Sequence, residues 1–355
     1  MCSSRLVIAL IAAVALAVPG AAGAATKTVT MGATPKQARV LQQQLSSDAN
    51  QFFRSTVTIH AGDAVRFAPF GFHNVDFPKR GGDPLPLVVP GAPTSGQVDA
   101  AGAPFWFNGQ PGVGFNPALT RSNFGKTLSY TGARAVNSGL PLAAKPKPMT
   151  VRFPRAGTFT YFCDVHPGMK GKVRVKRRGT PIPSKRADKS AVAQQVAKAV
   201  AAARKLRQTD APANSVFLGV ADRSGVEFFG MVPETLTVPV GTTVNFRMSA
   251  PSFEVHTGTF GPGDPEKEPN SYLGQLAASF QSPAFDPRAT YPSEPPGTTA
   301  SFRSTLHGNG FWNTGLLDAF QSPSPASAQV TFGQAGSFTF ICLVHPFMKG
   351  TVIVQ

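Results

Sequence analysis

The sequence contains few cysteines, few histidines and a single long apolar run. These scarcities limit the disulfides, metal sites and membrane spans that the protein can form. Only 3 of the 355 residues are cysteine and only 6 are histidine. Cys2 precedes the apolar run at residues 6–18, so the rest of the chain contains just Cys163 and Cys342. No later segment approaches the roughly 20 apolar residues that a membrane-spanning helix needs. The sequence therefore predicts neither a later membrane span nor more than one disulfide.

The first 24 residues have the pattern of an export signal. Arg5 supplies the positive start, residues 6–18 form the apolar run, and Ala22-Gly23-Ala24 offers a small-residue cleavage site. We expect residues 1–24 to be a signal peptide, and the mature protein to be soluble and either periplasmic or extracellular. Retention of this segment as a membrane anchor is the alternative.

Acidic residues are also scarce, and the resulting positive charge is uneven. The formal net charge is +16, and residues 172–207 carry 12 Lys or Arg against one acidic residue, whereas residues 208–355 carry 6 against 11. No interleaved aromatic and basic motif accompanies the basic stretch, so a nucleic-acid surface is not indicated. The stretch favours attraction to an acidic partner protein, an anionic membrane or a cell-wall polymer. A solvated linker is an equally good interpretation.

The two remaining cysteines each begin the same short motif. Cys163-Asp-Val-His166-Pro-Gly-Met169 and Cys342-Leu-Val-His345-Pro-Phe-Met348 lie 179 residues apart. Each places a thiolate, an imidazole and a thioether at spacings that one tight loop can fold around a metal ion. Cysteine, two histidines and a distant methionine are the ligands of blue-copper electron-transfer sites. A second histidine lies upstream in each half, His73 in the first and His256 in the second.

Three plainer interpretations of these residues remain. The two cysteines invite a disulfide in an oxidising compartment. A single buried Cys or Met usually fills a core, and zinc accepts Cys and His but takes Met poorly. None of the three explains why four residues repeat in register. The spare histidines, His60 and His307, are expected to be incidental, or for His307 to contact a partner or a secondary metal.

The segments around the motifs also repeat, which predicts a tandem duplication. Residues 56–67 match 235–246, and residues 149–163 match 328–342. They alternate with period two between Gly and Pro residues, as half-buried strands do. We expect an all-β protein with two β-sandwich domains, 25–176 and 213–355.

The remaining segments are expected to be helical or irregular. A basic linker at 177–212 should contain a helix over 189–207, and a second helix is predicted at 35–46. The Gly- and Pro-rich stretches 78–148 and 258–325 are expected to form extended loops, anchored by Phe105-Trp106-Phe107 and Phe311-Trp312.

At these residues the chain resembles the plastocyanin/azurin family of cupredoxins, and within it the amicyanin-like domains, whose gap before the methionine is equally short. The resemblance implies a Greek-key β-sandwich with one type 1 copper in each half. It implies the ligands His73, Cys163, His166 and Met169 in the first half and His256, Cys342, His345 and Met348 in the second. It also implies that the loop histidines, His166 and His345, are where the electron leaves.

The predicted function is transfer of single electrons between exported redox partners, with no enzymatic activity. Two-domain multicopper oxidases and copper nitrite reductases also resemble duplicated cupredoxins, but they need additional histidines. Here Phe162 and Ile341 precede the cysteines, and no His-x-His pair occurs. Copper storage or delivery is the other alternative, which the ligands alone do not exclude.

Overall fold

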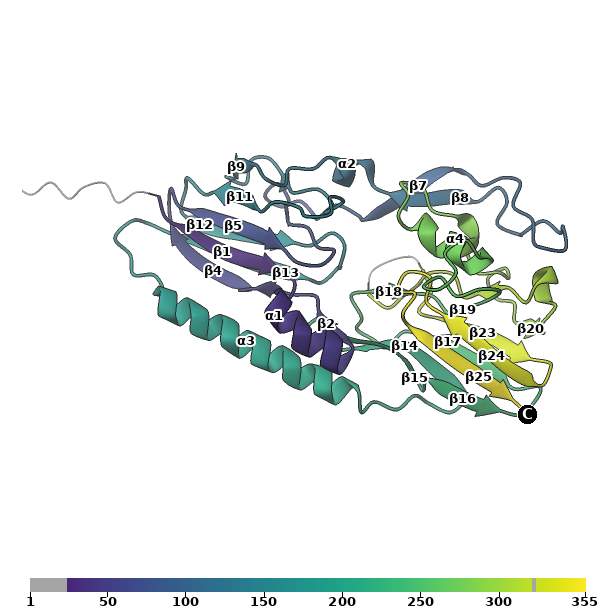
Figure 1. Cartoon of the computed structure of the whole chain (residues 1–355). Coiled ribbons are helices and arrows are strands. Elements are labelled where there is room, and N and C mark those ends of the chain that lie inside the picture. The colour runs from purple at the N-terminus through teal and green to yellow at the C-terminus, as the bar shows by residue number, and fades with distance from the viewer. Residues whose placement is uncertain (1–23, 321–323) are drawn as a thin grey trace, which may run out of the picture.

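The computed structural model describes residues 24–320 and 324–355, which form two β-sandwiches side by side (Figure 1). The predicted signal peptide, apart from residue 24, lies outside the described residues. The first sandwich has two sheets of five strands, in the orders β3-β1-β5-β11-β9 and β10-β6-β12-β13-β4. Their bounds are β1 (Thr26–Met31), β3 (Phe52–Phe53), β4 (Thr56–His60), β5 (Ala64–Pro69), β6 (Asp76–Phe77), β9 (Thr127–Ser129), β10 (Val136–Asn137), β11 (Met149–Arg152), β12 (Gly157–Phe162) and β13 (Lys170–Lys176).

The second sandwich pairs a sheet of six strands, β2-β15-β14-β17-β23-β20, with one of five, β16-β25-β24-β19-β21. A small sheet, β18-β22, lies beside them. The bounds are β2 (Ser47–Ala49), β14 (Ser215–Ala221), β15 (Val226–Val232), β16 (Thr235–Val238), β17 (Thr243–Arg247), β18 (Val255–His256), β19 (Thr259–Phe260), β20 (Ala300–Phe302), β21 (Trp312–Asn313), β22 (Leu317–Asp318), β23 (Ser327–Phe332), β24 (Gly336–Ile341) and β25 (Lys349–Val354).

Most of the strand order is the same in the two sandwiches. In the first sheets, β1-β5-β11-β9 corresponds to β14-β17-β23-β20, with parallel, antiparallel and parallel pairings in both. In the second sheets, β10-β6-β12-β13-β4 corresponds to β21-β19-β24-β25-β16. The predicted alternation is visible in β13, whose burial switches at every residue, so that Val173 and Val175 face the core.

Each sandwich has an aromatic core. In the first, Phe67 and Phe77 meet Tyr161 with ring centroids 5.1 and 5.2 Å apart. In the second, Phe246 meets Phe340 at 5.0 Å. Tyr161 and Phe340 each precede their cysteine by two residues, so they and Cys share the inward face of the strand. The core thus positions both sulfur atoms.

Helices cover the junction between the sandwiches. The long helix α3 (Lys185–Leu206) buries Ala199 and Ala203 against a cluster that joins Phe53 of the first half to Val226 of the second. The alanine-rich stripe of this helix therefore packs against both halves. The other helical segments are α1 (Pro35–Ala38), the π-helix η1 (Arg39–Gln44), α2 (Pro117–Thr120), α4 (Tyr272–Ser279), α5 (Pro287–Thr290) and the 3₁₀ turn η2 (Leu306–Gly308).

The interpretation of residues 78–148 and 258–325 as extended loops was incomplete. The first stretch contains the antiparallel ribbon β7 (Val88–Pro93) and β8 (Pro111–Phe115), which reaches over the second sandwich beside α4 (Figure 1). Prolines within β7 and an irregular register hide its alternation from the sequence. The aromatic anchors are confirmed, and they hold the other half: the Trp106 indole donates to the Pro292 carbonyl at 2.9 Å.

The ribbon and the strand β2 tie the halves together. Gly114 forms a bridge with Ala284, and the β2 segment, which lies within the range predicted for the first domain, pairs with β15 of the second sandwich.

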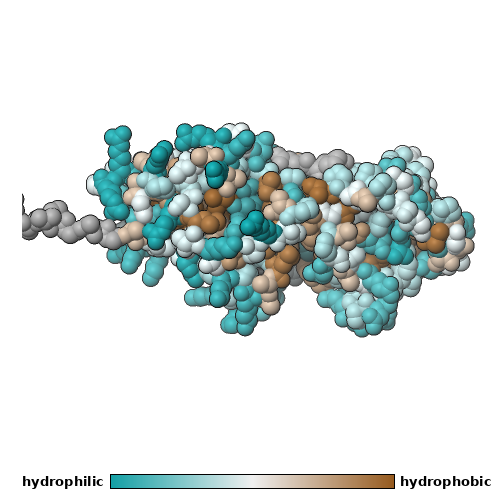
Figure 2. Space-filling view, turned by 90° about the horizontal axis from the view of Figure 1, so that it is seen from above, coloured by the Kyte–Doolittle hydropathy of each residue, from teal (hydrophilic) through white to brown (hydrophobic). Residues whose placement is uncertain are grey.

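In the view from above, hydrophilic side chains cover most of the first sandwich and apolar ones gather near the middle (Figure 2). No helix within residues 24–320 or 324–355 has the length and apolar character to cross a membrane.

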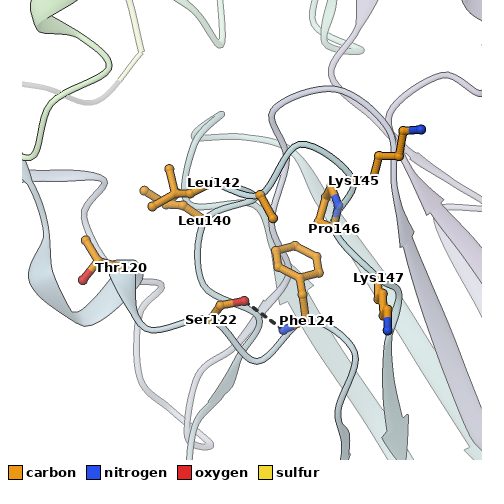
Figure 3. A pocket seen from close by; sticks show the side chains of 9 residues that line it. Thr120, Ser122, Phe124, Leu140, Leu142, Lys145, Pro146 and Lys147 are labelled. Atoms are coloured by element: carbon orange, nitrogen blue, oxygen red, sulfur yellow. Dashed lines mark hydrogen bonds between the residues drawn. The ribbon is translucent and has the colours of Figure 1, made fainter.

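One surface hollow of about 300 Å³ lies beside α2 in the first half (Figure 3). It is lined by Phe124, Leu140 and Leu142 together with the side chains of Lys145 and Lys147. No histidine, cysteine or acidic residue lines it. This hollow therefore offers none of the ligand types that the two motif loops contain.

Candidate metal centres

The first cluster forms where two loops meet at one end of the first sandwich. His73 lies between β5 and β6, and Cys163 and His166 lie between β12 and β13. The Nδ1 atoms of the two histidines are 2.9 Å apart, and the Cys163 Sγ is 3.9 Å from His73 Nδ1 and 3.6 Å from His166 Nδ1. All three side chains are buried. Two ring nitrogens and one sulfur thus face a common point.

The second cluster has the same arrangement. His256 ends β18, and Cys342 and His345 follow β24. The histidine Nδ1 atoms are 3.2 Å apart, and the Cys342 Sγ is 3.6 Å from His256 Nδ1 and 3.8 Å from His345 Nδ1. The upstream histidine lies on a strand in the second half only, since His73 lies in the loop before β6.

The motif loops close by the same backbone hydrogen bonds in both halves. The Cys163 N–H donates to the Met169 carbonyl at 2.9 Å, and the Met169 N–H donates to the His166 carbonyl at 2.9 Å. The second loop repeats both bonds, at 3.0 and 2.8 Å. Met169 and Met348 are buried in the same core cluster as the cysteine of their own loop. The structure therefore brings all four predicted residues of each half to one sandwich end.

The residue after each upstream histidine braces the cysteine loop. The Asp164 N–H donates to Asn74 Oδ1 at 2.7 Å, and the Asn74 amide donates back to the Asp164 carboxylate at 2.6 Å. In the second half the Leu343 N–H donates to Thr257 Oγ1 at 2.8 Å. The Thr257 N–H lies 3.4 Å from the Cys342 sulfur, where it can stabilise a thiolate.

A glycine makes room for each upstream imidazole. Gly32 follows β1 and Gly219 lies in β14, the corresponding strand, and both have positive φ, +83° and +78°. A Cβ on Gly32 would stand 2.7 Å from His73 Nε2, and one on Gly219 would stand 2.9 Å from His256 Nε2. The backbone thus approaches both rings as closely as only glycine permits.

The outer nitrogens of three of the four histidines face carboxylates that the sequence reasoning did not assign. His256 Nε2 lies 2.9 Å from Glu227 Oε1. Glu254 lies between the two halves, with Oε1 3.1 Å from His166 Nε2 and Oε2 3.8 Å from His345 Nε2. The only sequence feature that could have pointed to one of these carboxylates is that Glu254 lies two residues before His256. Metal-binding histidines usually donate their second N–H to a group of this kind.

The surroundings of Cys342 favour its thiolate form. Burial alone would raise the pKa of the Cys342 thiol, but His256 and His345 hold that pKa well below its usual value. Burial alone would lower the pKa of His256, and the contacts with Cys342 and Glu227 instead raise it to about 10. Burial would raise the pKa of Glu254, and the charge of His166 lowers it. A charged sulfur is the form that binds metal.

The donor sets fit a copper ion better than other metals. Each cluster offers two imidazole nitrogens and one sulfur, all within 4.8 Å of one another. Sulfur donors favour soft ions, and the methionine in each loop suits copper and not zinc. Because Nδ1 atoms converge while Nε2 atoms of His166 and His256 contact carboxylates, ring orientation is already fixed.

The two spare histidines lie outside both clusters. His60 ends β4, and its Nε2 is 2.8 Å from the Thr180 carbonyl oxygen. His307 was expected to be incidental or to contact a partner. In the structure it joins two long loops of this chain, with Nδ1 3.1 Å from Asp99 and Nε2 3.3 Å from Glu294.

Solved structures of amicyanins align with parts of this chain. Amicyanin from Paracoccus versutus is 19% identical over 36% of this chain and 73% of that chain, with a TM-score of 0.19. A variant of amicyanin in its reduced Cu(I) form is 18% identical over 44% of this chain and 85% of that chain, with a TM-score of 0.21. No protein-family model and no curated protein matches the sequence. The geometry of the two histidine and cysteine clusters is therefore the main evidence for the function.

Proposed function

We propose that this protein is an exported carrier of single electrons that binds one type 1 copper ion in each half. The observation that carries the proposal is the convergence, twice in one chain, of two histidine Nδ1 atoms and a buried cysteine sulfur. His73, Cys163, His166 and Met169 would hold the first ion, and His256, Cys342, His345 and Met348 the second. A copper ion in such a set changes between Cu(I) and Cu(II) with little rearrangement of its ligands.

The protein contributes rigidity and exclusion of water. The sulfur and the upstream imidazole of each set are buried. Asn74 and Thr257 fix the cysteine loops, and Glu227 fixes the His256 ring. A ligand set that cannot relax suits a site whose charge must change repeatedly. This rigidity argues against copper delivery, which needs ligands that exchange.

We propose no catalytic role for the chain. An oxidase or nitrite reductase needs a further copper site built from additional histidines. His60 contacts a backbone carbonyl, and His307 contacts Asp99 and Glu294. Neither of them lies in either cluster.

The partner is proposed to be another exported redox protein that contacts the second half. His166 is one of the two residues through which the electron is expected to leave, but its ring is directed at Glu254. The ring of Phe253 also covers its loop, and lies so close to Gly168 that a Cβ there would collide with it. The side chain of His345 is 19% exposed, and the neighbouring Phe347 is 56% exposed. An apolar ring beside an accessible ligand is a suitable contact for a transient partner. The basic stretch 172–207 would attract an acidic one.

Metal analysis and spectroscopy of the full, exported chain test this proposal. We expect two copper ions per chain, intense visible colour, and reversible loss of colour on reduction. A third, colourless copper with normal hyperfine splitting would instead indicate an enzyme. Copper without strong colour, or none at all, would contradict electron transfer.

Single cysteine variants assign each colour to a half. Cys342→Ser removes the sulfur of the second set only, so one copper and its colour are expected to remain. Cys163→Ser is the matched control and should leave the other centre. Visible spectra and copper counts measure both. Loss of both colours from either variant, or of neither, would show that the ligand sets are assigned wrongly.

A further inference from the structure

Glu254 is the residue that the two candidate centres share. It lies in the segment between β17 and β18, at the junction of the two sandwiches, and its side chain is buried. Its Oε1 is 3.1 Å from His166 Nε2 of the first half, and its Oε2 is 3.8 Å from His345 Nε2 of the second. The Asn50 amide also donates to Oε1 at 2.8 Å. One carboxylate thus separates the outer nitrogens of the two loop histidines.

Hydrogen bonds from both halves hold Glu254 and its partner Asn50 in place. The Glu254 N–H donates to Ser252 Oγ at 3.0 Å, and the Ser252 hydroxyl donates to Glu227 Oε2 at 2.7 Å. Glu227 in turn contacts His256. On the other side, the Asn50 N–H donates to the Gly225 carbonyl at 2.7 Å. Glu254 therefore belongs to a buried network that touches three of the four imidazoles.

The two contacts of Glu254 differ in kind. The 3.1 Å separation from His166 is a hydrogen-bonding distance, whereas 3.8 Å from His345 is an ion-pair distance. An ordinary ion pair between two domains would explain one of them. It does not explain why the same carboxylate faces a predicted ligand of each set. In a buried setting its charge acts strongly on both.

We infer that Glu254 is a positioning residue common to both metal centres. This inference rests on the proposed function, because it concerns the ligands of the two copper ions. Glu254 fixes the His166 ring by its hydrogen bond and places one negative charge beside both ligand sets. That charge favours the more positive, oxidised state of either centre.

The test compares three isosteric variants of the full chain. Glu254→Gln removes the shared charge, Glu227→Gln removes a charge beside His256 alone, and Glu234→Gln removes one from an exposed turn. Cu(II) affinity is measured at each centre by chelator competition, and the two reduction potentials by redox titration. In copper-free protein, NMR of the imidazole nitrogens reports the contacts directly.

We expect Glu254→Gln to weaken Cu(II) binding about tenfold or more at both centres and to raise both potentials. Glu227→Gln should change only the second centre, and Glu234→Gln neither. In the copper-free protein, Glu254→Gln should shift the ring signals of both His166 and His345. Glu254→Asp keeps the negative charge on a shorter side chain. Compared with Glu254→Gln, it should bring both reduction potentials back towards those of the unaltered chain, and the His166 ring signal less so.

Two results would overturn the inference, and they differ from failure of the proposed function. If Glu254→Gln alters one centre only, or neither, while two coloured copper ions remain bound, the shared role of Glu254 is wrong. Unchanged ring signals for either loop histidine in the copper-free variant would also contradict it. If the unaltered chain itself does not bind two coloured copper ions, the proposed function fails instead.

Discussion

At the scale of single residues, the candidate centres depend on contacts that leave no spare volume. The ring of each upstream histidine lies against a glycine of positive φ, and the residue after it ties the cysteine loop by its side chain. The backbone therefore fixes the position of each histidine ring and of the cysteine loop beside it. Small changes at these positions should alter one centre while the fold persists.

Replacing Gly219 by alanine should disturb the second centre alone. The new Cβ would stand 2.6 Å from Glu227 Oε1 and 2.9 Å from His256 Nε2, so the ring must move. We expect copper affinity at the second centre to fall about tenfold or more, since loss of an outer contact typically has that effect. Chelator competition at both centres measures it.

Gly241→Ala is the matched control for this change. Gly241 also has positive φ, +87°, but a Cβ there meets nothing within 4 Å. Both variants bear the backbone strain of about 1–2 kcal/mol that alanine suffers in this conformation. Equal copper affinity in the two variants would show that the close approach to His256 is unimportant.

At the scale of elements, α3 was predicted as a basic linker helix and proves to be part of the interdomain packing. Its face with Ala199 and Ala203 is buried in a cluster that contains residues of both sandwiches. Asp188 in its first turn pairs with Lys27 at 2.7 Å and also with Arg54. The helix therefore fixes one half relative to the other while its charged face remains outside.

An acidic residue on the buried face of α3 should loosen the molecule. Ala203 is fully buried, so in Ala203→Asp a carboxylate would lack partners, and the free energy of unfolding should fall by about 2–4 kcal/mol. Ala201 is exposed on the same helix, and Ala201→Asp should lower the free energy of unfolding by about 1 kcal/mol at most, through its lower helix propensity. Denaturant unfolding measures both. Similar values would contradict the docking of this face.

At the scale of the whole molecule, four features join the halves: the β7–β8 ribbon, the strand β2 that pairs with β15, the helix α3 and the carboxylate of Glu254. Phe105 and Phe107 of the first half pack in one cluster with Leu273 and Phe311 of the second. His307 reinforces this contact, since Asp99 lies in the first half and Glu294 in the second. The two candidate centres are consequently held face to face.

The His307 contact should make stability depend on pH. Burial lowers the pKa of His307, but Glu294 and Asp99 raise it above its usual value overall. A raised pKa in the folded state means that the stabilisation is complete below the unfolded value of about 6.5 and is lost as pH rises through the folded value. The rings of Phe105 and Phe311 are its other neighbours, and they carry no charge.

We therefore expect His307→Gln to melt at a lower temperature than the unaltered chain in mildly acidic solution, near about pH 5.5. The difference should shrink towards about pH 9, where both side chains are neutral. Thermal unfolding of the two proteins across this range measures it. A gap that is constant with pH, or that grows as pH rises, would show that the ion pairs do not stabilise the junction.

Much of each sandwich and the members of each cluster followed from local patterns. Alternation identified the strands near Val173 and Val175, because a strand with one buried face must alternate. The repeated motif identified Cys163 and Cys342 as members of corresponding sites, and each directly follows a strand in the structure. These features depend on residues close together in the chain.

The carboxylates and the junction could not be predicted in the same way. Glu227 lies 29 residues before His256, and Glu254 lies 88 residues after His166, with no spacing rule to connect them. Gly114 of the ribbon and the strand β2 both pair with segments that are far away in the sequence. The strand β7 contains prolines that conceal its strand character.

The sequence by itself determined that each half would be a β-sandwich with one set of nitrogen and sulfur donors, because strand period and motif spacing are local properties of the chain. Only the tertiary structure decided that the two sets face each other across Glu254. The relative placement of the halves depends on apolar burial and hydrogen bonds between distant segments, and these form only when both sandwiches have folded and packed together.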